Sequence, residues 1–316
     1  MTIGLILHIG YVSEIPWIMD QFKAVEQHPE FTIVTILDQD FRDPTATQAI
    51  QQAVQFFSTW PHIQILPVEN RGYDIGPFLT AMHVFSKLLK KPDVIVKLHT
   101  KRDLQVRTDN WSGLKQFSNV QQYFETHPDV NMVVSSRSCL ACRQVPDHNE
   151  YYISEICRQL SISKQEELQM TGMLFPNATM FAARTACFMP YLDALQSIPL
   201  NTPFSIDAFW YVQPWVHYTA SKQYSSQFSS DHTGPVKTMA EFARDHYVEH
   251  FDQFAPNPSA LKVVKNSSFF VSETSQQRYC NVHRNGAIEH AMERVLAFLC
   301  CFDKSTFCQA RFQLLL

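Results

Sequence analysis

Residues 63–78 have the sequence Ile-Gln-Ile-Leu-Pro-Val-Glu-Asn-Arg-Gly-Tyr-Asp-Ile-Gly-Pro-Phe, an apolar run followed by a polar turn. The run from Ile63 to Val68 predicts a buried strand. Pro77 falls in the first turn of a helix predicted from Gly76 to Leu89, where a missing N–H costs little. A strand that passes through a short polar turn into a helix is typical of an α/β fold.

The same unit recurs on both sides of this segment. Further strands are predicted at Ile3–Ile9, Phe31–Leu37 and Val94–Leu98, and further helices at Glu14–Glu26 and Thr45–Phe57. Alternating strands and helices predict a parallel sheet that is covered on both faces. Ligands bind beyond the carboxyl ends of such strands. The informative residues are therefore expected at His8–Tyr11, Asp38–Asp40, Glu69–Asp74 and His99–Asp103.

The chain beyond residue 100 is less regular. The pattern predicts one helix at Asn110–Glu125, a strand at Asn131–Ser135, helices at Tyr151–Gln159 and Lys164–Met170, a strand-turn at Met173–Ala183, and a last helix at Gly286–Phe302. The segment at about 199–280 is rich in aromatic residues, serine and proline and follows no clear period. We expect a single domain, 1–316, with an irregular aromatic-rich insertion at about 199–280.

Composition excludes several classes of protein. The 316 residues include 26 Lys+Arg and 30 Asp+Glu, which gives a net charge of −4, and 45% are hydrophobic. Such a chain is not disordered, and it lacks the basic excess of a nucleic-acid binder. It has 8 glycines and no glycine-rich motif of the dinucleotide, P-loop or α/β-hydrolase type. A methyltransferase would also need a glycine-rich turn after the first strand.

Location and metal content are also addressed by the sequence. It shows neither a signal peptide nor an apolar run of the ~20 residues that a membrane-spanning helix needs. Its cysteines do not suggest a disulfide framework, so we expect a cytoplasmic protein with reduced thiols. Cys139 and Cys142 have CxxC spacing, but no second ligand pair accompanies them, so no metal site is predicted.

The polar turn after Val68 has the composition of an anion site. Arg71 supplies a cation, Gly72 permits an unusual backbone conformation, and the helix N-terminus supplies N–H groups. Asp74 is suited either to cap the helix or to bind a ribose hydroxyl. The alternative is a tight strand-to-helix turn in which Asp74 is the N-cap.

A second candidate follows the strand at Val94–Leu98. His99, Lys101 and Arg102 are cationic or ionisable, with one carboxylate at Asp103. Cations there would neutralise a leaving diphosphate in place of a divalent ion. The alternative is a solvated basic strand end.

Three carboxylates are candidates for a general base. Glu293 lies with His290 on one face of the last helix, and Glu289 lies one turn before Glu293. Asp207 lies among aromatic residues that would suit sugar faces. A carboxylate or a His–carboxylate pair suits deprotonation of a hydroxyl. The alternatives are a salt-bridged helix for the first two and an N-cap for Asp207.

Five blocks of the sequence resemble the rhamnan synthesis protein F family, in the same order. They are residues 7–11 with the strand 31–35, Asn-Arg-Gly-Tyr-Asp-Ile-Gly-Pro-Phe at 70–78, Lys-Leu-His-Thr-Lys at 97–101, Asn177 with Ala-Thr-Met-Phe-Ala-Ala-Arg at 178–184, and His-Ala-Met-Glu-Arg at 290–294. The sequence departs from the family pattern at Ala178, where glycine is expected, and at Ala182, where tryptophan is expected. Residues 283–286 also replace an acidic motif.

The resemblance implies a cytosolic glycosyltransferase that builds rhamnose-containing or related polysaccharides. The order of these motifs along the chain is also similar to that of GT-A glycosyltransferases. This similarity implies a Rossmann-type central mixed sheet flanked by helices, with a nucleotide-sugar half at 1–135 and an acceptor half at 136–316. The implied donor is a dTDP-, UDP- or GDP-linked sugar, L-rhamnose first among them. The acceptor is a glycan, lipid- or protein-linked, and transfer is inverting. Mn²⁺ or Mg²⁺ is compatible with the sequence and not required by it.

The implied roles fall on particular residues. Those that bind the donor are His8, Gly10, Tyr11, Asp38, Asn70, Arg71, Gly72, Asp74, His99, Asn177 and His290. Lys101 stabilises the leaving diphosphate, and Asp207, Glu289 or Glu293 is the base. Because the sequence lacks a DxD motif, a non-catalytic module that binds nucleotide sugars or carbohydrate is the alternative.

Overall fold

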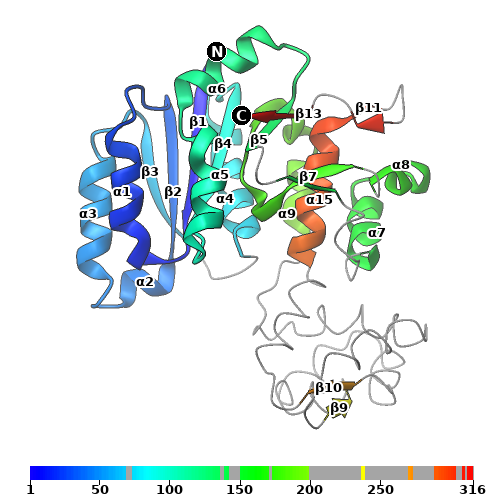
Figure 1. Ribbon diagram of the computed structural model, residues 1–316, viewed down its shortest axis with the longest axis horizontal. Coiled ribbons are helices and arrows are strands. Elements are labelled where there is room, and N and C mark those ends of the chain that lie inside the picture. The colour runs from blue at the N-terminus through cyan, green and yellow to red at the C-terminus, as the bar shows by residue number, and fades with distance from the viewer. Residues whose placement is uncertain are drawn as a thin grey trace. The chain divides into compact units, whose positions relative to one another are not determined.

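The computed structural model describes residues 1–68, 73–135, 139–141, 150–170, 173–198, 236–238, 270–272, 288–303, 308–309 and 312–315. One compact unit comprises Met1–Val145, Cys157–Pro199 and Glu293–Leu316, and a second comprises Pro146–Ile156 and Leu200–Met292. The first unit contains a large mixed sheet flanked by helices (Figure 1). The division into a nucleotide-sugar half and an acceptor half stays a prediction.

The main sheet has seven strands in the order β13-β5-β8-β4-β1-β2-β3. Their bounds are Ile3–Ile9 (β1), Phe31–Leu37 (β2), Ile63–Val68 (β3), Val94–His99 (β4), Met132–Ser135 (β5), Phe181–Arg184 (β8) and Phe312–Leu315 (β13). β1 pairs in parallel with β2 and β4, and β2 with β3, as predicted for the first hundred residues. β8 is antiparallel to β4 and β5, and β13 is parallel to β5. The sheet is therefore mixed, as predicted.

Helices and short paired strands make up the rest of the described structure. The α-helices are Ile15–Lys23 (α1), Asp38–Arg42 (α2), Thr47–Phe57 (α3), Ile75–Lys87 (α4), Leu104–Leu114 (α5), Phe117–Thr126 (α6), Glu150–Gln159 (α7), Lys164–Gln169 (α8), Leu192–Ser197 (α9) and Ile288–Cys301 (α15). The 3-10 turns are Val12–Glu14 (η1), Asn177–Thr179 (η4), Thr185–Cys187 (η5) and Met189–Tyr191 (η6). The short strand pairs are Cys139–Ala141 (β6) with Leu174–Pro176 (β7), Val236–Thr238 (β9) with Phe270–Ser272 (β10), and Phe302–Asp303 (β11) with Cys308–Gln309 (β12). No helix in the described part of the chain is long and apolar enough to cross a membrane.

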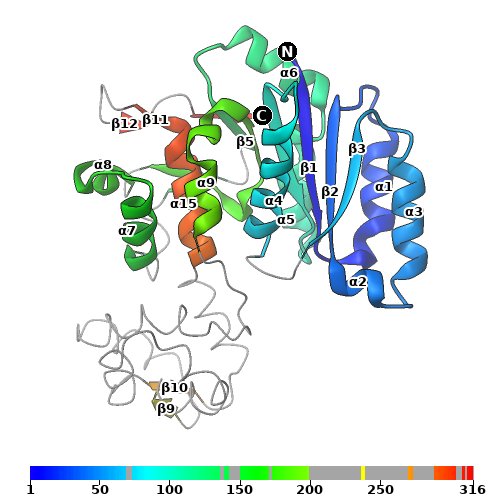
Figure 2. The ribbon, with the colours of Figure 1, turned by 180° about the vertical axis from the view of Figure 1, so that it is seen from behind.

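Alternation along the strands divides the core between two faces of the sheet. Leu5 and Leu7 of β1 join a buried cluster with residues of α1, α3, α5 and α6. Residues of the opposite parity, such as Ile6, point to the other face because successive strand side chains alternate. Figure 2 shows α4 and α9 on that second face. Polar side chains of that parity at the carboxyl ends of the strands therefore lie near the N-terminus of α4.

The single helix predicted from Asn110 to Glu125 is wrong, because the chain forms α5 and α6 instead. α5 starts earlier, since the Asp103 carboxylate accepts a hydrogen bond of 2.9 Å from the Val106 N–H as an N-cap. α5 ends at Leu114, directly after Gly113, a residue type that weakens a helix interior. Gln116 then has a non-helical ψ of 79°. The break allows Trp111 of α5 and Phe117 of α6 to pack into the same core.

Gly4 of β1 is a position where the packing leaves no room for a side chain. A Cβ there would lie 2.8 Å from Pro92 Cγ and 3.1 Å from Phe85 Cζ. We expect Gly4→Ala to lower the free energy of unfolding by about 1–3 kcal/mol, as overpacking does. Urea unfolding measures this. Gly113→Ala in α5 is the control, and helix propensity predicts the opposite sign there. Equal stabilisation by both substitutions would contradict the packing around β1.

Candidate functional site

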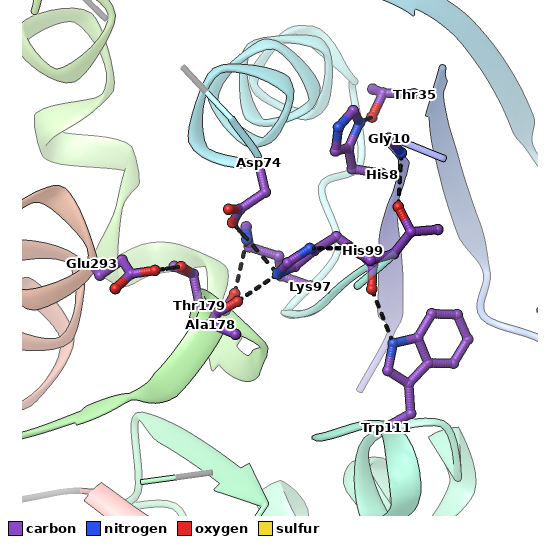
Figure 3. A network of polar contacts seen from close by, with 11 residues as sticks. His8, Gly10, Thr35, Asp74, Lys97, His99, Trp111, Ala178, Thr179 and Glu293 are labelled. Carbon is purple, nitrogen blue, oxygen red and sulfur yellow. Dashed lines mark hydrogen bonds and ion pairs between the residues drawn. The ribbon is translucent and has the colours of Figure 1, made fainter. Parts of the chain in front are cut away.

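Four polar side chains lie together at the carboxyl ends of the central strands, on the α4 face. His8 of β1 is in register with Thr35 of β2 and with His99 of β4. Lys97 lies two residues before His99 and therefore points to the same face. All four are buried. Figure 3 shows them with Asp74, which precedes α4, and with the turn before β8.

The Lys97 ammonium is the centre of this group. Its side chain is 1% exposed and forms an ion pair with Asp74. It also donates a hydrogen bond of 2.8 Å to the Thr179 carbonyl oxygen. The rings of Phe78 and Phe181 lie 5.7 and 6.0 Å from Nζ, within reach of a cation–π contact. Burial lowers the pKa of Lys97, and the Asp74 carboxylate opposes that change.

Asp74 occupies the N-cap position of α4, but its side chain makes no capping hydrogen bond. Its carboxylate binds Lys97 instead, and its Oδ2 lies 3.8 Å from His99 Nε2. Burial raises the pKa of Asp74, but Lys97, followed by His99, lowers it further and holds it well below its ordinary value. Asp74 is therefore the N-cap residue by position, as the alternative has it, but its carboxylate pairs with Lys97 instead of capping the helix.

The turn before β8 supplies two carbonyl oxygens in an unusual conformation. Ala178 and Thr179 have φ values of 61° and 56°, in the left-handed region. That region costs an L-residue about 1–2 kcal/mol, and it is rarer still for a β-branched one such as Thr179. The glycine expected at position 178 from the family pattern would adopt this φ freely. Two strained residues in succession are maintained by the contacts of their carbonyl groups with His99 and Lys97.

His99 is held from three directions. Its Nε2 lies 2.5 Å from the Ala178 carbonyl oxygen and its Nδ1 lies 2.8 Å from the Thr100 carbonyl oxygen. Trp111 Nε1–H donates to the His99 carbonyl oxygen at 3.2 Å. Burial lowers the pKa of His99 to about 4, against the attraction of Asp74. Two facing carbonyls favour a doubly protonated ring, but the loss of hydration outweighs them, so the imidazole is neutral at pH 7.

His8 lies beside Gly10 and Thr100. Its Nδ1 is 3.1 Å from Thr35 Oγ1, and burial followed by repulsion from His99 lowers its pKa to about 3. A Cβ at Gly10 would lie 3.1 Å from His8 Nε2, which explains a glycine at this position. The Gly10 N–H donates to Thr100 Oγ1 at 2.9 Å. These contacts join the end of β1 to the end of β4.

Among the three candidate bases, Glu293 is the one whose side chain the structure describes. Its Oε1 accepts a hydrogen bond of 2.6 Å from Thr179 Oγ1. Burial, followed by repulsion from Asp74, raises the pKa of Glu293. Glu289 lies in the first turn of α15, but its side chain is outside the described residues, as is all of Asp207.

Lys101 follows β4 and is half-buried. Its ammonium group makes no hydrogen bond or ion pair with any residue that the structure describes. Its charge nevertheless lowers the pKa of Asp74 and of Glu293, as a smaller contribution beside burial and the nearer charges. The next residue, Arg102, places its guanidinium 4.8 Å from the ring centroid of Tyr11.

The remaining predicted site residues are placed only in part. Asp38 starts α2 at the carboxyl end of β2, and its carboxylate accepts a hydrogen bond of 2.6 Å from Arg42. The turn residues Asn70, Arg71 and Gly72 lie outside the described residues, as do the side chains of Asn177 and His290. The convergence of Arg71 with Lys101 therefore stays a prediction. In the part of the chain that is described, no three His, Cys, Asp or Glu side chains form a group suited to a metal ion.

Sequence reasoning missed Lys97 and Thr179 as members of this group. Lys97 could have been recognised because it lies two residues before His99, and therefore on the same face, in a strand that is otherwise apolar. A lysine in such a strand needs a buried partner of opposite charge. No sequence pattern indicated Thr179, because its contacts depend on a left-handed backbone conformation. A glycine at position 178 would have indicated that conformation, but the residue there is alanine.

Comparison with known proteins agrees with the resemblance noted in the sequence. The family model described as rhamnan synthesis protein F matches residues 1–197. No curated protein matches the chain. The matched region includes Asp74, Lys97, His99 and Lys101 and ends at the last residue of α9. Glu293 lies beyond it.

The buried ion pair predicts a non-additive pair of substitutions. Lys97→Met leaves the Asp74 carboxylate buried without its partner, which costs about 3–5 kcal/mol of unfolding free energy. Adding Asp74→Asn removes that charge, so the double variant should be more stable than Lys97→Met alone. Urea unfolding of both single variants and the double variant measures the coupling. Exposed Lys87→Met in α4 is the control, expected within about 0.5 kcal/mol of the unchanged chain. Additive losses would contradict the ion pair.

The two neutral histidines predict how stability depends on pH. Their pKa values of about 3 and about 4 lie below the ordinary 6.5. Below pH 6.5 the unfolded chain binds protons that the folded chain does not. The free energy of unfolding should therefore fall as the pH drops from 6.5 towards 4, by up to about 1.4 kcal/mol per pH unit for each histidine.

Thermal unfolding between pH 7 and pH 5 tests this dependence. His8→Gln should reduce the loss of stability between pH 7 and pH 5, with each protein compared with its own stability at pH 7. His83→Gln, on the exposed side of α4, should leave it unchanged. The same slope in the His8 variant and in the unchanged chain would show that His8 is not held neutral.

Proposed function

The chain belongs to the rhamnan synthesis protein F family, and from this premise we propose that it is a glycosyltransferase that uses a nucleoside diphosphate sugar. Membership of the family places the chain in the synthesis of rhamnan or a related polysaccharide. The proposal adds the reaction: an inverting transfer of a hexosyl or deoxyhexosyl group to a growing glycan. L-Rhamnose is the first sugar to test, because the family is described by rhamnan synthesis.

The observation that carries this proposal is the position of Lys101. This half-buried ammonium has no ionic partner among the described residues, yet it lies close enough to Asp74 and Glu293 to change their pKa values. Asp74 is already paired with Lys97. A cation that the described residues leave unneutralised, at the carboxyl edge of the sheet, is suited to the charge of a departing diphosphate.

Glu293 is the best supported of the three candidate bases. Burial and Asp74 raise its pKa, which brings a carboxylate closer to the range in which it accepts a proton efficiently. In the proposed step, Glu293 takes the proton of the acceptor hydroxyl and that oxygen forms a bond to the anomeric carbon. The bond from this carbon to the diphosphate oxygen breaks, and the nucleoside diphosphate leaves with the electron pair beside Lys101.

The fold supports the GT-A-like placement of the donor. His8 lies at the carboxyl end of β1, Gly10 and Tyr11 follow β1, and Asp38 follows β2, where the base of the nucleotide is proposed to bind. Arg71, Asn70 and Asp74 are proposed for the ribose and diphosphate. A mixed sheet in which β8 is reversed also agrees with the GT-A-like arrangement.

A ligand screen tests the proposal directly. UDP-, GDP- and dTDP-linked sugars are added in turn, and a true donor raises the melting temperature by mass action. Transfer to glycan acceptors is then assayed with and without EDTA, which also determines whether a divalent ion takes part. Stabilisation without transfer would favour the non-catalytic binding module. No stabilisation by any of the three would contradict the proposal.

Two substitutions separate the proposed roles. Lys101→Ala should abolish detectable transfer, while Glu293→Gln should lower kcat by about 10²–10⁴-fold, the range of general-base catalysis. Lys87→Ala is the control, because this exposed lysine lies at the far end of α4. Circular dichroism confirms that each variant folds. Near-normal transfer by folded Lys101→Ala would rule out its role at the diphosphate.

A further inference from the structure

We propose that Arg107 is a positioning residue that fixes Lys101 by joining the segment after β4 to the segment after β1. This inference rests on the proposed function, because it assigns Arg107 a part in holding the cation that receives the diphosphate. Arg107 belongs to α5 and does not itself point to the group around Lys97.

The contacts of Arg107 are few and specific. The residue is 3% exposed. Its Nη1 donates a hydrogen bond of 3.0 Å to the Lys101 carbonyl oxygen. The same nitrogen forms an ion pair with the Glu14 carboxylate, and the guanidinium stacks 4.0 Å from the ring centroid of Trp17.

This guanidinium therefore lies between two segments that carry predicted donor-binding groups. Glu14 is the last residue of η1, which begins directly after Tyr11, and Lys101 follows β4. A lysine would keep the charge but lacks the flat shape that stacks on Trp17 while donating to two oxygens. The arrangement thus depends on arginine in particular.

Lys101 lies in a short segment whose other backbone positions are fixed by contacts of their own. The Thr100 N–H donates to the His8 carbonyl oxygen at 3.0 Å, and Asp103 caps α5. Between them, the carbonyl of Lys101 is held by Arg107. A fixed carbonyl fixes the peptide plane after Lys101, and with it the direction in which the Lys101 side chain leaves the backbone.

Stability alone does not explain why a buried arginine stands at position 107. Its Nε is buried and finds no partner among the described residues. A buried donor without a partner destabilises the folded state, and buried ion pairs are often replaced by apolar residues without loss of stability. Its contact with the Lys101 carbonyl gives this costly residue a role in the site.

The test is a double-mutant cycle on nucleotide binding. UDP, GDP and dTDP are each titrated by calorimetry into the full chain, Lys101→Ala, Arg107→Lys and the double variant. If Arg107 acts through Lys101, Arg107→Lys should weaken the binding of the nucleotide that the unchanged chain prefers by about tenfold. The double variant should bind no more weakly than Lys101→Ala alone. A merely structural role predicts that the two losses add.

Further variants keep the result interpretable. Glu14→Gln should weaken the same binding less than Arg107→Lys does, because it loosens Arg107 without removing it. Exposed Arg158→Lys in α7 is the control and should bind as the unchanged chain does. Binding that falls in Lys101→Ala but stays normal in Arg107→Lys and Glu14→Gln overturns this inference alone. If none of the three nucleotides binds to the unchanged chain, the proposed function falls and this inference falls with it.

Discussion

A buried ammonium must be surrounded by acceptors, and this requirement of Lys97 organises the site. Removing a charge from water costs several kcal/mol even after the protein relaxes. The Asp74 carboxylate and the Thr179 carbonyl oxygen meet that need. The start of α4, the end of β4 and the turn before β8 are therefore fixed together, although they are far apart in the sequence. Through the Thr179 hydroxyl, the same constraint extends to Glu293 of α15.

The strain in the turn before β8 follows from this constraint. Ala178 and Thr179 take left-handed conformations, and each directs its carbonyl oxygen to a side chain of β4. An extended turn would avoid the strain but would leave Lys97 with one acceptor fewer. The contacts of the two carbonyl oxygens with Lys97 and His99 offset the strain of this turn.

The sequence predicted the parallel half of the sheet because each strand is a short apolar run between polar turns. It also predicted that polar residues would gather at the carboxyl edge, and His8, Asp74 and His99 do so. It failed where local signals compete with tertiary contacts. Asp74 has the position and chemistry of an N-cap, yet the nearby ammonium binds its carboxylate more strongly than helix N–H groups would.

Two other failures have the same physical origin. The helix predicted from Asn110 to Glu125 breaks because Trp111 and Phe117 both reach the core only if the chain bends between them. Lys97 was not recognised as a member of the site because the sequence around it does not show which carboxylate would pair with it. Its partner lies 23 residues away and reaches it only in the folded sheet.

The two groups proposed for catalysis are both held indirectly. Glu293 is oriented by the hydroxyl of Thr179, and the backbone of Lys101 by Arg107, so neither depends on a direct ion pair with the Lys97–Asp74 centre. Direct pairing would neutralise the charge that each must offer to a ligand. The family match covers Lys101 and Thr179 but stops before α15. The residues proposed to face the donor diphosphate thus lie within the matched region. Glu293, the proposed base, comes from α15, beyond the matched region.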